Sequence, residues 1–222
     1  MNLRAFFAEF VGTFTLIFIG VAAIASNHVT QGDLGMVGIA LAHGLAIAVM
    51  VSATAAVSGG HLNPAVTFGA YIARKIDTVN ATGYVVAQCL GGLAAAWIVG
   101  RLFAADVMSA IGWGTPLPGA GVDAGQAILA EIVLTFFLVF VVFGTGIDPR
   151  APKVGGLFIG LTVTLDILAG GAISGGAMNP ARHLGPALLG GHAGTIWMYW
   201  VGPLIGGGLA ALAYHHILER RT

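Results

Sequence analysis

Two stretches of this sequence share one eight-residue pattern, and both contain polar groups that could act on a small solute. Residues 58–65 read Ser-Gly-Gly-His-Leu-Asn-Pro-Ala, and residues 174–181 read Ser-Gly-Gly-Ala-Met-Asn-Pro-Ala. Asparagine is a good N-cap and proline is tolerated at the first helical position, so each pattern predicts a helix start. A helix start exposes unpaired backbone N–H groups and about half a positive charge. The amides of Asn63 and Asn179 can each spare an N–H for a solute between them.

The composition indicates the solvent in which these helix starts lie. The 222 residues include 9 Lys+Arg and 9 Asp+Glu, or 8% charged residues, whereas soluble domains carry about 25%. Hydrophobic residues make up 57% and the mean hydropathy is +0.92, so the solvent must be largely lipid. A net charge of zero offers no basic surface for nucleic acid. The single cysteine, Cys89, excludes an internal disulfide and a cysteine metal cluster.

Six apolar stretches are long enough to cross a bilayer, which takes about 20 residues. They are Ala5–Ala25, Gly35–Val57, Thr82–Phe103, Gln126–Gly144, Gly156–Ala172 and Ile196–Ile217. Two shorter stretches, Asn63–Ile72 and Asn179–Leu189, reach only halfway at about 1.5 Å per residue. We therefore expect two re-entrant half-helices whose irregular entry loops are buried in protein or line water.

The cations predict how the spans are oriented. Seven of the nine cluster at the two ends of the chain and in the second and fourth loops: Arg4, Arg74, Lys75, Arg150, Lys153, Arg220 and Arg221. The loops at residues 26–34 and 104–125 contain no Lys or Arg. With six spans all seven cations lie on one side, so the positive-inside rule predicts that both termini are cytoplasmic.

The two halves of the chain follow one plan. The pattern at residues 58–65 recurs 116 residues later, Gly91-Gly92 recurs as Gly206-Gly207, and Ala8-Glu9 recurs as Ala130-Glu131. We expect a single channel domain, residues 1–222, built from inverted repeats at about 1–104 and 126–222 that an extracellular loop joins. The half-helices then meet with their N-termini at the midplane, where their positive ends repel cations and protons. A water oxygen that accepts from both asparagines must turn its hydrogens toward the mouths, which interrupts proton hopping.

These features together resemble the major intrinsic protein (aquaporin) family over essentially the whole chain. The resemblance rests on two Asn-Pro-Ala motifs, on Arg182 directly after the second, and on Glu9 and Glu131 within a six-span inverted repeat. The stretches 42–46, 58–68, 166–171 and 199–204 resemble the tonoplast branch and its ammonia-permeable relatives. The resemblance implies an all-α membrane protein with the aquaporin fold that forms a homotetramer and needs no cofactor. It also implies a pore at the motif residues Asn63, Pro64, Ala65, Asn179, Pro180 and Ala181.

In that family four positions form an outer constriction, the selectivity filter. Their spacing from the motif asparagines places them here at His43, Ile167, Gly176 and Arg182. Members tuned narrowly for water usually have Phe in place of His43 and His in place of Ile167, so this set resembles the ammonia-permeable filter. Helical spacing adds Ile47 and Val163, one turn from His43 and Ile167, as an apolar pore wall.

Several other polar residues admit more than one interpretation. The resemblance gives Glu9 and Glu131 a structural role, in which they accept hydrogen bonds from the loops that lead into the half-helices. His61 is expected to line the cytoplasmic vestibule, or only to support its loop. Asp166 stands where tonoplast-like proteins typically have Asn; it could brace the filter, pair with a neighbour such as His43, or face a subunit interface.

The sequence thus predicts a passive channel for water, and the resemblance adds neutral ammonia, with hydrogen peroxide and urea as further candidates. A facilitator of glycerol or small polyols is an alternative, although the stacking aromatics of glycerol channels are missing. An ion-coupled secondary transporter is another, but it would need carboxylates or unwound carbonyls at the midplane. No nucleophile–base pair, metal-ligand spacing or nucleotide loop indicates an enzyme. Short loops without targeting extensions suggest the plasma (inner) membrane of a prokaryote.

Overall fold

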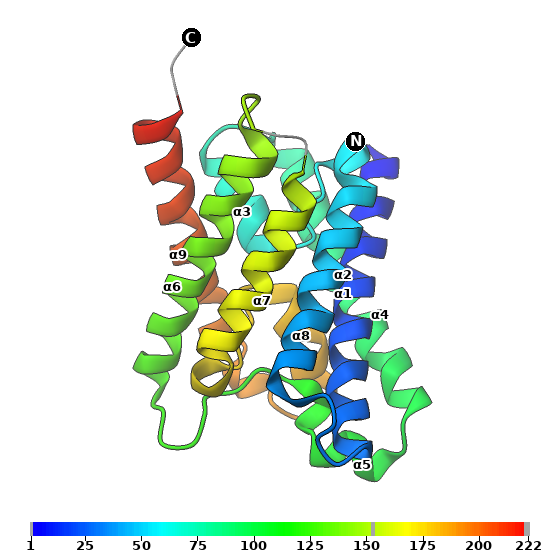
Figure 1. Ribbon diagram of the computed structural model, residues 1–222. Coiled ribbons are helices and arrows are strands. Elements are labelled where there is room, and N and C mark those ends of the chain that lie inside the picture. The colour runs from blue at the N-terminus through cyan, green and yellow to red at the C-terminus, as the bar shows by residue number, and fades with distance from the viewer. Residues whose placement is uncertain (1, 152–153, 220–222) are drawn as a thin grey trace.

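The computed structural model describes residues 2–151 and 154–219, and these residues form helices joined by loops, without a strand (Figure 1). Six helical segments are long and apolar enough to span a membrane: Leu3–Val29, Gly35–Ser58, Thr78–Leu102, Ala124–Ile147, Gly155–Ser174 and Ala193–Leu218. Two further helices, α3 (Pro64–Ile72) and α8 (Pro180–Leu189), are short. The predicted all-α fold of six spans and two half-helices is therefore confirmed, with span boundaries that differ by only a few residues.

The long helices are α1 (Leu3–Val29), α2 (Gly35–Ser58), α4 (Thr78–Leu102), α6 (Ala124–Val142), α7 (Gly155–Ser174) and α9 (Met198–Ala213). Two of them end in a π-helical turn, η2 (Phe143–Ile147) after α6 and η4 (Tyr214–Leu218) after α9. The loop between the halves holds two short elements that the sequence pattern did not predict, α5 (Ala105–Ala110) and the 3-10 turn η1 (Gly112–Gly114). A 3-10 turn, η3 (Ala193–Thr195), precedes α9.

The helix contacts repeat between the halves and also link them. α1 packs along α4 as α6 packs along α9, while α2 and α7 pack against each other where the halves meet. The half-helices contact the opposite half, since α3 packs on α9 and α8 packs on α4. Each half-helix therefore depends on a long helix of the other repeat for its place.

The contact between α2 and α7 is so close that backbone touches backbone. A Cβ atom on Gly44 would lie 2.5 Å from the carbonyl oxygen of Gly160, and a Cβ on Gly160 would lie 2.3 Å from the carbonyl oxygen of Gly44. Small residues allow this approach in membrane helices, where packing and hydrogen bonding drive association. The two helices that carry His43 and Ile167 are thus held at a short, fixed spacing.

The start of α1 and the end of η4 lie at the same end of the bundle, and α5 lies at the opposite end (Figure 1). Arg74, Lys75 and Arg150 follow helices that finish at the end shared by the termini. Lys153, Arg220 and Arg221 lie outside the described residues. Which end faces the cytoplasm stays a prediction from the charges.

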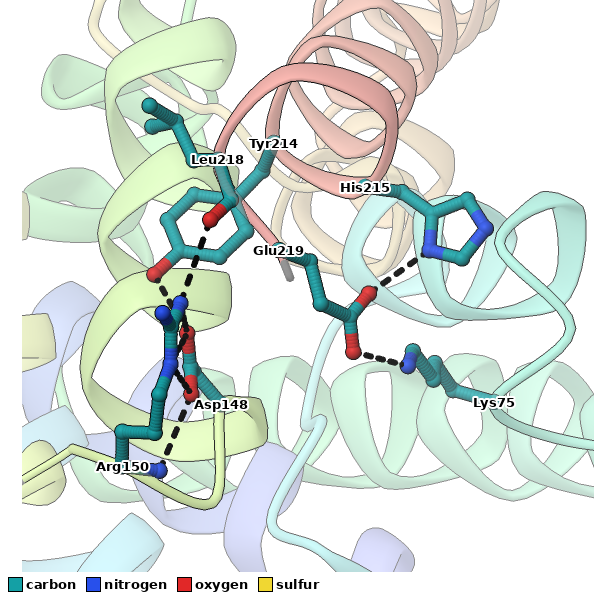
Figure 2. A network of polar contacts seen from close by, with 7 residues as sticks. All are labelled: Lys75, Asp148, Arg150, Tyr214, His215, Leu218 and Glu219. Atoms are coloured by element: carbon teal, nitrogen blue, oxygen red, sulfur yellow. Dashed lines mark hydrogen bonds and ion pairs between the residues drawn. The ribbon is translucent and has the colours of Figure 1, made fainter. Parts of the chain in front are cut away.

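One polar cluster ties the α6–α7 loop to the end of the last span (Figure 2). The Arg150 guanidinium pairs with the Asp148 carboxylate and donates from Nη2 to the carbonyl oxygen of Leu218 at 3.2 Å. The Tyr214 hydroxyl donates to Asp148 Oδ2 at 3.0 Å. Hydrogen bonds from Arg150 hold the pKa of the Asp148 carboxyl below its ordinary value.

A second cluster ties the α3–α4 loop to the same terminal turn. Glu219 accepts from Lys75 Nζ at 2.5 Å, and its other oxygen lies 2.6 Å from His215 Nδ1 (Figure 2). The hydrogen bond from Lys75, and then that from His215, lowers the pKa of Glu219. Both loops at this end of the bundle are therefore fixed to the C-terminal turn.

Candidate functional site

A cavity with about 480 Å³ of empty space, called the channel below, lies among the long helices and the two half-helix starts. Its lining includes nine residues that were expected to face the pore: His43, Ile47, His61, Asn63, Val163, Ile167, Gly176, Asn179 and Arg182. The other four motif residues, Pro64, Ala65, Pro180 and Ala181, are buried and begin the half-helices beside the lining. The motif asparagines thus face the channel while the prolines and alanines shape the helix starts.

Each motif asparagine caps its own half-helix. The side-chain oxygen of Asn63 accepts from the N–H of Ala65 at 2.8 Å. That of Asn179 accepts from the N–H of Ala181 at 3.0 Å and of Arg182 at 3.2 Å. The proline that follows each asparagine has no N–H to leave unpaired, so the helix starts cleanly.

The two amide nitrogens cross to the opposite loop. Asn63 Nδ2 donates to the carbonyl oxygen of Met178 at 2.8 Å, and Asn179 Nδ2 donates to that of Leu62 at 3.0 Å. An asparagine amide has two N–H groups, so one remains on each side for the channel. This reciprocal pair of bonds sets the two helix starts face to face, and the sequence alone did not reveal it.

The carbonyls that accept these bonds belong to residues with unusual backbones. Leu62 has φ 52° and Met178 has φ 51°, both in the left-handed region that non-glycine residues seldom adopt. Both side chains are fully buried, and that of Leu62 packs against Gly12, where a Cβ would lie 2.3 Å from Leu62 Cδ2. The strain is local to the two positions where the loops contact each other, as is common at functional sites.

A buried carboxylate holds the loop before α3. Glu9 accepts from Ser58 Oγ at 2.6 Å and from the backbone N–H groups of His61 at 2.9 Å and Leu62 at 2.6 Å. Gln88 Nε2 donates to the same carboxylate at 2.7 Å. Four hydrogen bonds thus satisfy a side chain that is fully buried.

The second repeat uses the same device. Glu131 accepts from Ser174 Oγ at 2.7 Å and from the N–H groups of Ala177 at 2.9 Å and Met178 at 2.6 Å.

Two tyrosines support the same loops in an equivalent way. The Tyr84 hydroxyl donates to the carbonyl oxygen of Ser58 at 2.8 Å, and the Tyr199 hydroxyl donates to that of Ser174 at 2.6 Å. Tyr84 and Tyr199 lie 115 residues apart, as the repeated glycine pairs do. This spacing was the sequence signal that could have revealed their equivalent role.

Arg182 and His43, two of the predicted filter residues, contact each other directly. Arg182 Nε donates to His43 Nε2 at 3.3 Å, and its Nη1 donates to the carbonyl oxygen of Gly114 in the central loop at 2.9 Å. His43 Nδ1 lies 2.8 Å from the carbonyl oxygen of Ile39, so Nδ1 carries the hydrogen and Nε2 accepts. Both ring nitrogens of His43 are therefore bonded to protein atoms, and neither is left for a solute.

Two glycines make room at the predicted filter. A Cβ on Gly20 of α1 would lie 2.2 Å from His43 Nε2, so the imidazole rests directly on the backbone of that helix. Gly176 has φ 57°, and a Cβ there would lie 3.3 Å from Ile167 Cα. Gly176 is thus favoured both by its left-handed backbone conformation and by its close approach to α7. The sequence did not reveal that Gly20 and Gly114 lie beside the predicted filter.

Two residues for which the sequence left more than one role, His61 and Asp166, have defined surroundings in the structure. His61 lines the channel, and its Nδ1 lies 3.1 Å from Thr67 Oγ1 on α3, so it both faces the vestibule and supports its loop. Asp166 is 4% exposed, and its Oδ2 has no hydrogen-bond partner within residues 2–151 and 154–219. It does not pair with His43, since Ile39 and Arg182 occupy both imidazole nitrogens.

Six spans that enclose a channel, with two half-helices starting at its centre, define an α-helical membrane channel. The profile of the major intrinsic protein family matches residues 1–214, and the chain belongs to this family of aquaporins. Aquaporin TIP4-4 of Zea mays is 47% identical over 221 residues, which cover 95% of this chain and 85% of that protein. Probable aquaporin TIP2-2 of Oryza sativa subsp. japonica is 42% identical over 97% of this chain and 88% of that protein.

A solved structure shares the fold. The X-ray structure of the aquaglyceroporin from Plasmodium falciparum matches with a TM-score of 0.88 at 26% identity, covering 98% of this chain and 97% of that one. The curated relatives confirm the resemblance to tonoplast intrinsic proteins. These relatives are plant proteins, which does not fit the expectation of a prokaryotic plasma membrane. The chain is an integral membrane protein.

Proposed function

We propose that this protein is a passive channel that conducts water in single file and excludes protons and other ions. The observation that carries the proposal is the pair of half-helices that begin at Asn63 and Asn179 on one channel. Each amide has one N–H bonded to the opposite loop and one left for the lumen. A water oxygen that accepts from both must point its hydrogens along the channel in opposite directions, which interrupts a proton relay.

Two sources of positive potential support the exclusion of cations. The half-helix starts each place about half a positive charge beside the asparagines. Arg182 is 5% exposed and lines the channel, and a guanidinium has five N–H donors. Its bonds to His43 and Gly114 fix its position and leave donors for water that passes the filter.

We infer that neutral ammonia also passes, with hydrogen peroxide and urea as further candidates. Ile167 gives the filter an apolar wall, and Gly176 has no side chain that would narrow it. Both residues line the channel. With both nitrogens of His43 bonded, Arg182 is the filter side chain left with free donors. Its charge opposes ammonium, so transported nitrogen would cross as the uncharged molecule.

The alternatives find less support in the geometry. A glycerol facilitator would be helped by aromatic rings at the filter, but the imidazoles of His43 and His61 are the only rings that line this channel within the described residues. Ion coupling would need free carboxylates at the midplane. Glu9 and Glu131 are instead engaged by three or more hydrogen bonds each.

We further propose a homotetramer with both termini in the cytoplasm. The assembly follows from the family resemblance, and large apolar side chains such as Val49 and Leu165 are exposed on α2 and α7, where subunits or lipid would cover them. The orientation follows from Arg4, Arg74 and Arg150 at the end shared by the termini. Native mass spectrometry and protease access to sealed vesicles would test the two statements separately.

The test of function is flux into vesicles that contain the purified protein. We expect rapid shrinkage in an osmotic jump and faster internal alkalinisation in an ammonium jump than in empty vesicles. Ile167→His should reduce ammonia flux more than water flux, because it adds a polar ring to the apolar side of the filter, whereas Ile173→His on the exposed side of α7 should change neither. Fast water flux without ammonia flux would contradict only the ammonia assignment, and slow flux of both would contradict the channel.

A further inference from the structure

A groove outside the channel opens on the surface between α3, α4 and α9. It has about 790 Å³ of empty volume and is lined by apolar side chains that include Phe68 of α3, Val86 of α4 and Leu204 of α9. Phe68 is 37% exposed and Val86 is 53% exposed, so the groove is uncovered in the single chain. Since α4 and α9 belong to spanning segments, either hydrocarbon or another chain must cover it.

The groove has the length of one bilayer leaflet. It follows α3 from Pro64 at the half-helix start to Tyr71 near its end, where Thr78 begins α4. The nine residues of α3 rise about 13 Å, close to half of a hydrocarbon core that is about 30 Å thick. An acyl chain that enters from the terminal end of the bundle would therefore reach the midplane within it.

Its outer end carries polar and cationic groups. Tyr71 and Thr78 line both the groove and a second hollow that contains Arg74, Lys75 and Asp77. Thr78 Oγ1 donates to the Tyr71 hydroxyl at 3.5 Å, so two hydroxyls stand where the apolar lining ends.

The charges at this rim leave one cation available. Lys75 is paired with Glu219, and the Asp77 carboxylate accepts from the backbone and side chain of Asn80. Arg74 is exposed in a turn with φ 58° and makes no ion pair within the described residues. An apolar groove that ends at one free guanidinium and two hydroxyls is complementary to a chain that carries a phosphate.

We propose that this groove binds one phospholipid, with an acyl chain between Phe68, Val86 and Leu204 and its phosphate beside Arg74. The guanidinium of Arg74 and the hydroxyls of Tyr71 and Thr78 at the end of the groove favour a phosphate-bearing lipid over an apolar helix of a second copy. The site lies outside the channel and does not depend on what the channel conducts.

Native mass spectrometry of the intact purified protein, titrated with dioleoyl phosphatidylglycerol, tests this site. We expect one saturable lipid per chain and at least tenfold weaker binding in Thr82→Phe, which fills the groove from α4. Arg74→Gln should bind about fivefold more weakly, because one cation near an anionic headgroup contributes about 1 kcal/mol. Dioleoylglycerol, which has no phosphate, should bind the natural protein more weakly and be insensitive to Arg74→Gln.

Two matched controls accompany these variants. Val79→Phe adds the same ring to an exposed position of α4 outside the groove, and Arg4→Gln removes another exposed cation at the same end of the bundle. Both should bind as the natural protein does. Equal binding by Thr82→Phe and Val79→Phe would overturn the site, and loss of the oligomer in Thr82→Phe would show that the groove is a subunit interface instead.

Discussion

Arg182 Nε donates to His43 Nε2 at 3.3 Å, and this bond makes the imidazole a support for the arginine. The opposite ring nitrogen is bonded to the carbonyl oxygen of Ile39, which fixes both the tautomer and the tilt of the ring. The bond from Arg182 Nη1 to the carbonyl of Gly114 gives the guanidinium a second attachment, so the side chain from α8 is held by both α2 and the central loop. The position of the Arg182 guanidinium is therefore set by its neighbours and not by its own rotamer alone.

The first prediction concerns Gly20, on which the His43 imidazole rests. Gly20→Ala would place a methyl group 2.2 Å from His43 Nε2 and push the ring toward the lumen. We expect about tenfold slower water flux in stopped-flow shrinkage, since a barrier higher by about 1.4 kcal/mol has that effect. Gly38→Ala, whose methyl group would meet only the Leu34 side chain at 3.0 Å, should be unaffected.

The double variant Gly20→Ala, His43→Ala should regain most of the flux, because the displaced ring is gone. Slow flux that persists in the double variant would show that the methyl group acts on helix packing and not through His43.

The second prediction concerns the positive centre of the channel. Arg182→Val removes the filter cation without adding bulk, and we expect a proton or sodium leak that a pH dye or a patch recording detects. Asn63→Asp should disturb the barrier from the midplane, because a carboxylate would stand at the start of α3. If both variants stay as tight to ions as the natural protein, the barrier lies at neither place.

The third prediction concerns the buried acids. In Glu9→Gln and Glu131→Gln an amide NH₂ would face backbone donors that now meet a carboxylate oxygen. We expect each to lower the free energy of unfolding by about 1–3 kcal/mol, the range for a buried donor left unpaired. The thermal midpoint in detergent would show this, with the exposed Asp33→Asn as a control that should not move it.

The fourth prediction concerns pH at the end shared by the termini. The Asp148 carboxyl has a lowered pKa in the folded protein because Arg150 and then other donors bind its charged form. Its stabilising effect is therefore complete above the ordinary pKa of about 3.9 and is lost as the pH falls from there toward the folded pKa.

The measurement is the thermal midpoint of the natural protein and of Asp148→Asn between pH 6 and pH 3. We expect the natural protein to be the more stable at pH 6 and the difference to shrink as the pH falls. A difference that stays constant over this range would mean that the pair with Arg150 adds nothing to the fold.

The helices could be predicted because the features that specify them are local. An apolar run of about 20 residues and an Asn-Pro start each determine an element through neighbours in the sequence. The channel lining could be extended in the same way, since Val51 and Ile159 continue the helical stripes of Ile47 and Val163.

The contacts between the loops were not predictable, because they join residues far apart in the chain through backbone atoms. The Asn63 amide donates to the carbonyl of Met178, and the guanidinium of Arg182 donates to the carbonyl of Gly114. A carbonyl leaves no signature in the residue type that bears it. The same holds for Gly20, where an absent side chain near His43 only becomes informative once the two helices are placed side by side.

Water and proton flux measured in the same vesicles test the central claim most directly. Vesicles that contain the natural protein should shrink much faster than empty vesicles, with a low activation energy, while an imposed pH gradient decays no faster than in empty vesicles. Water flux no faster than in empty vesicles, or a pH gradient that collapses through the natural protein, would contradict the assignment of a proton-excluding water channel.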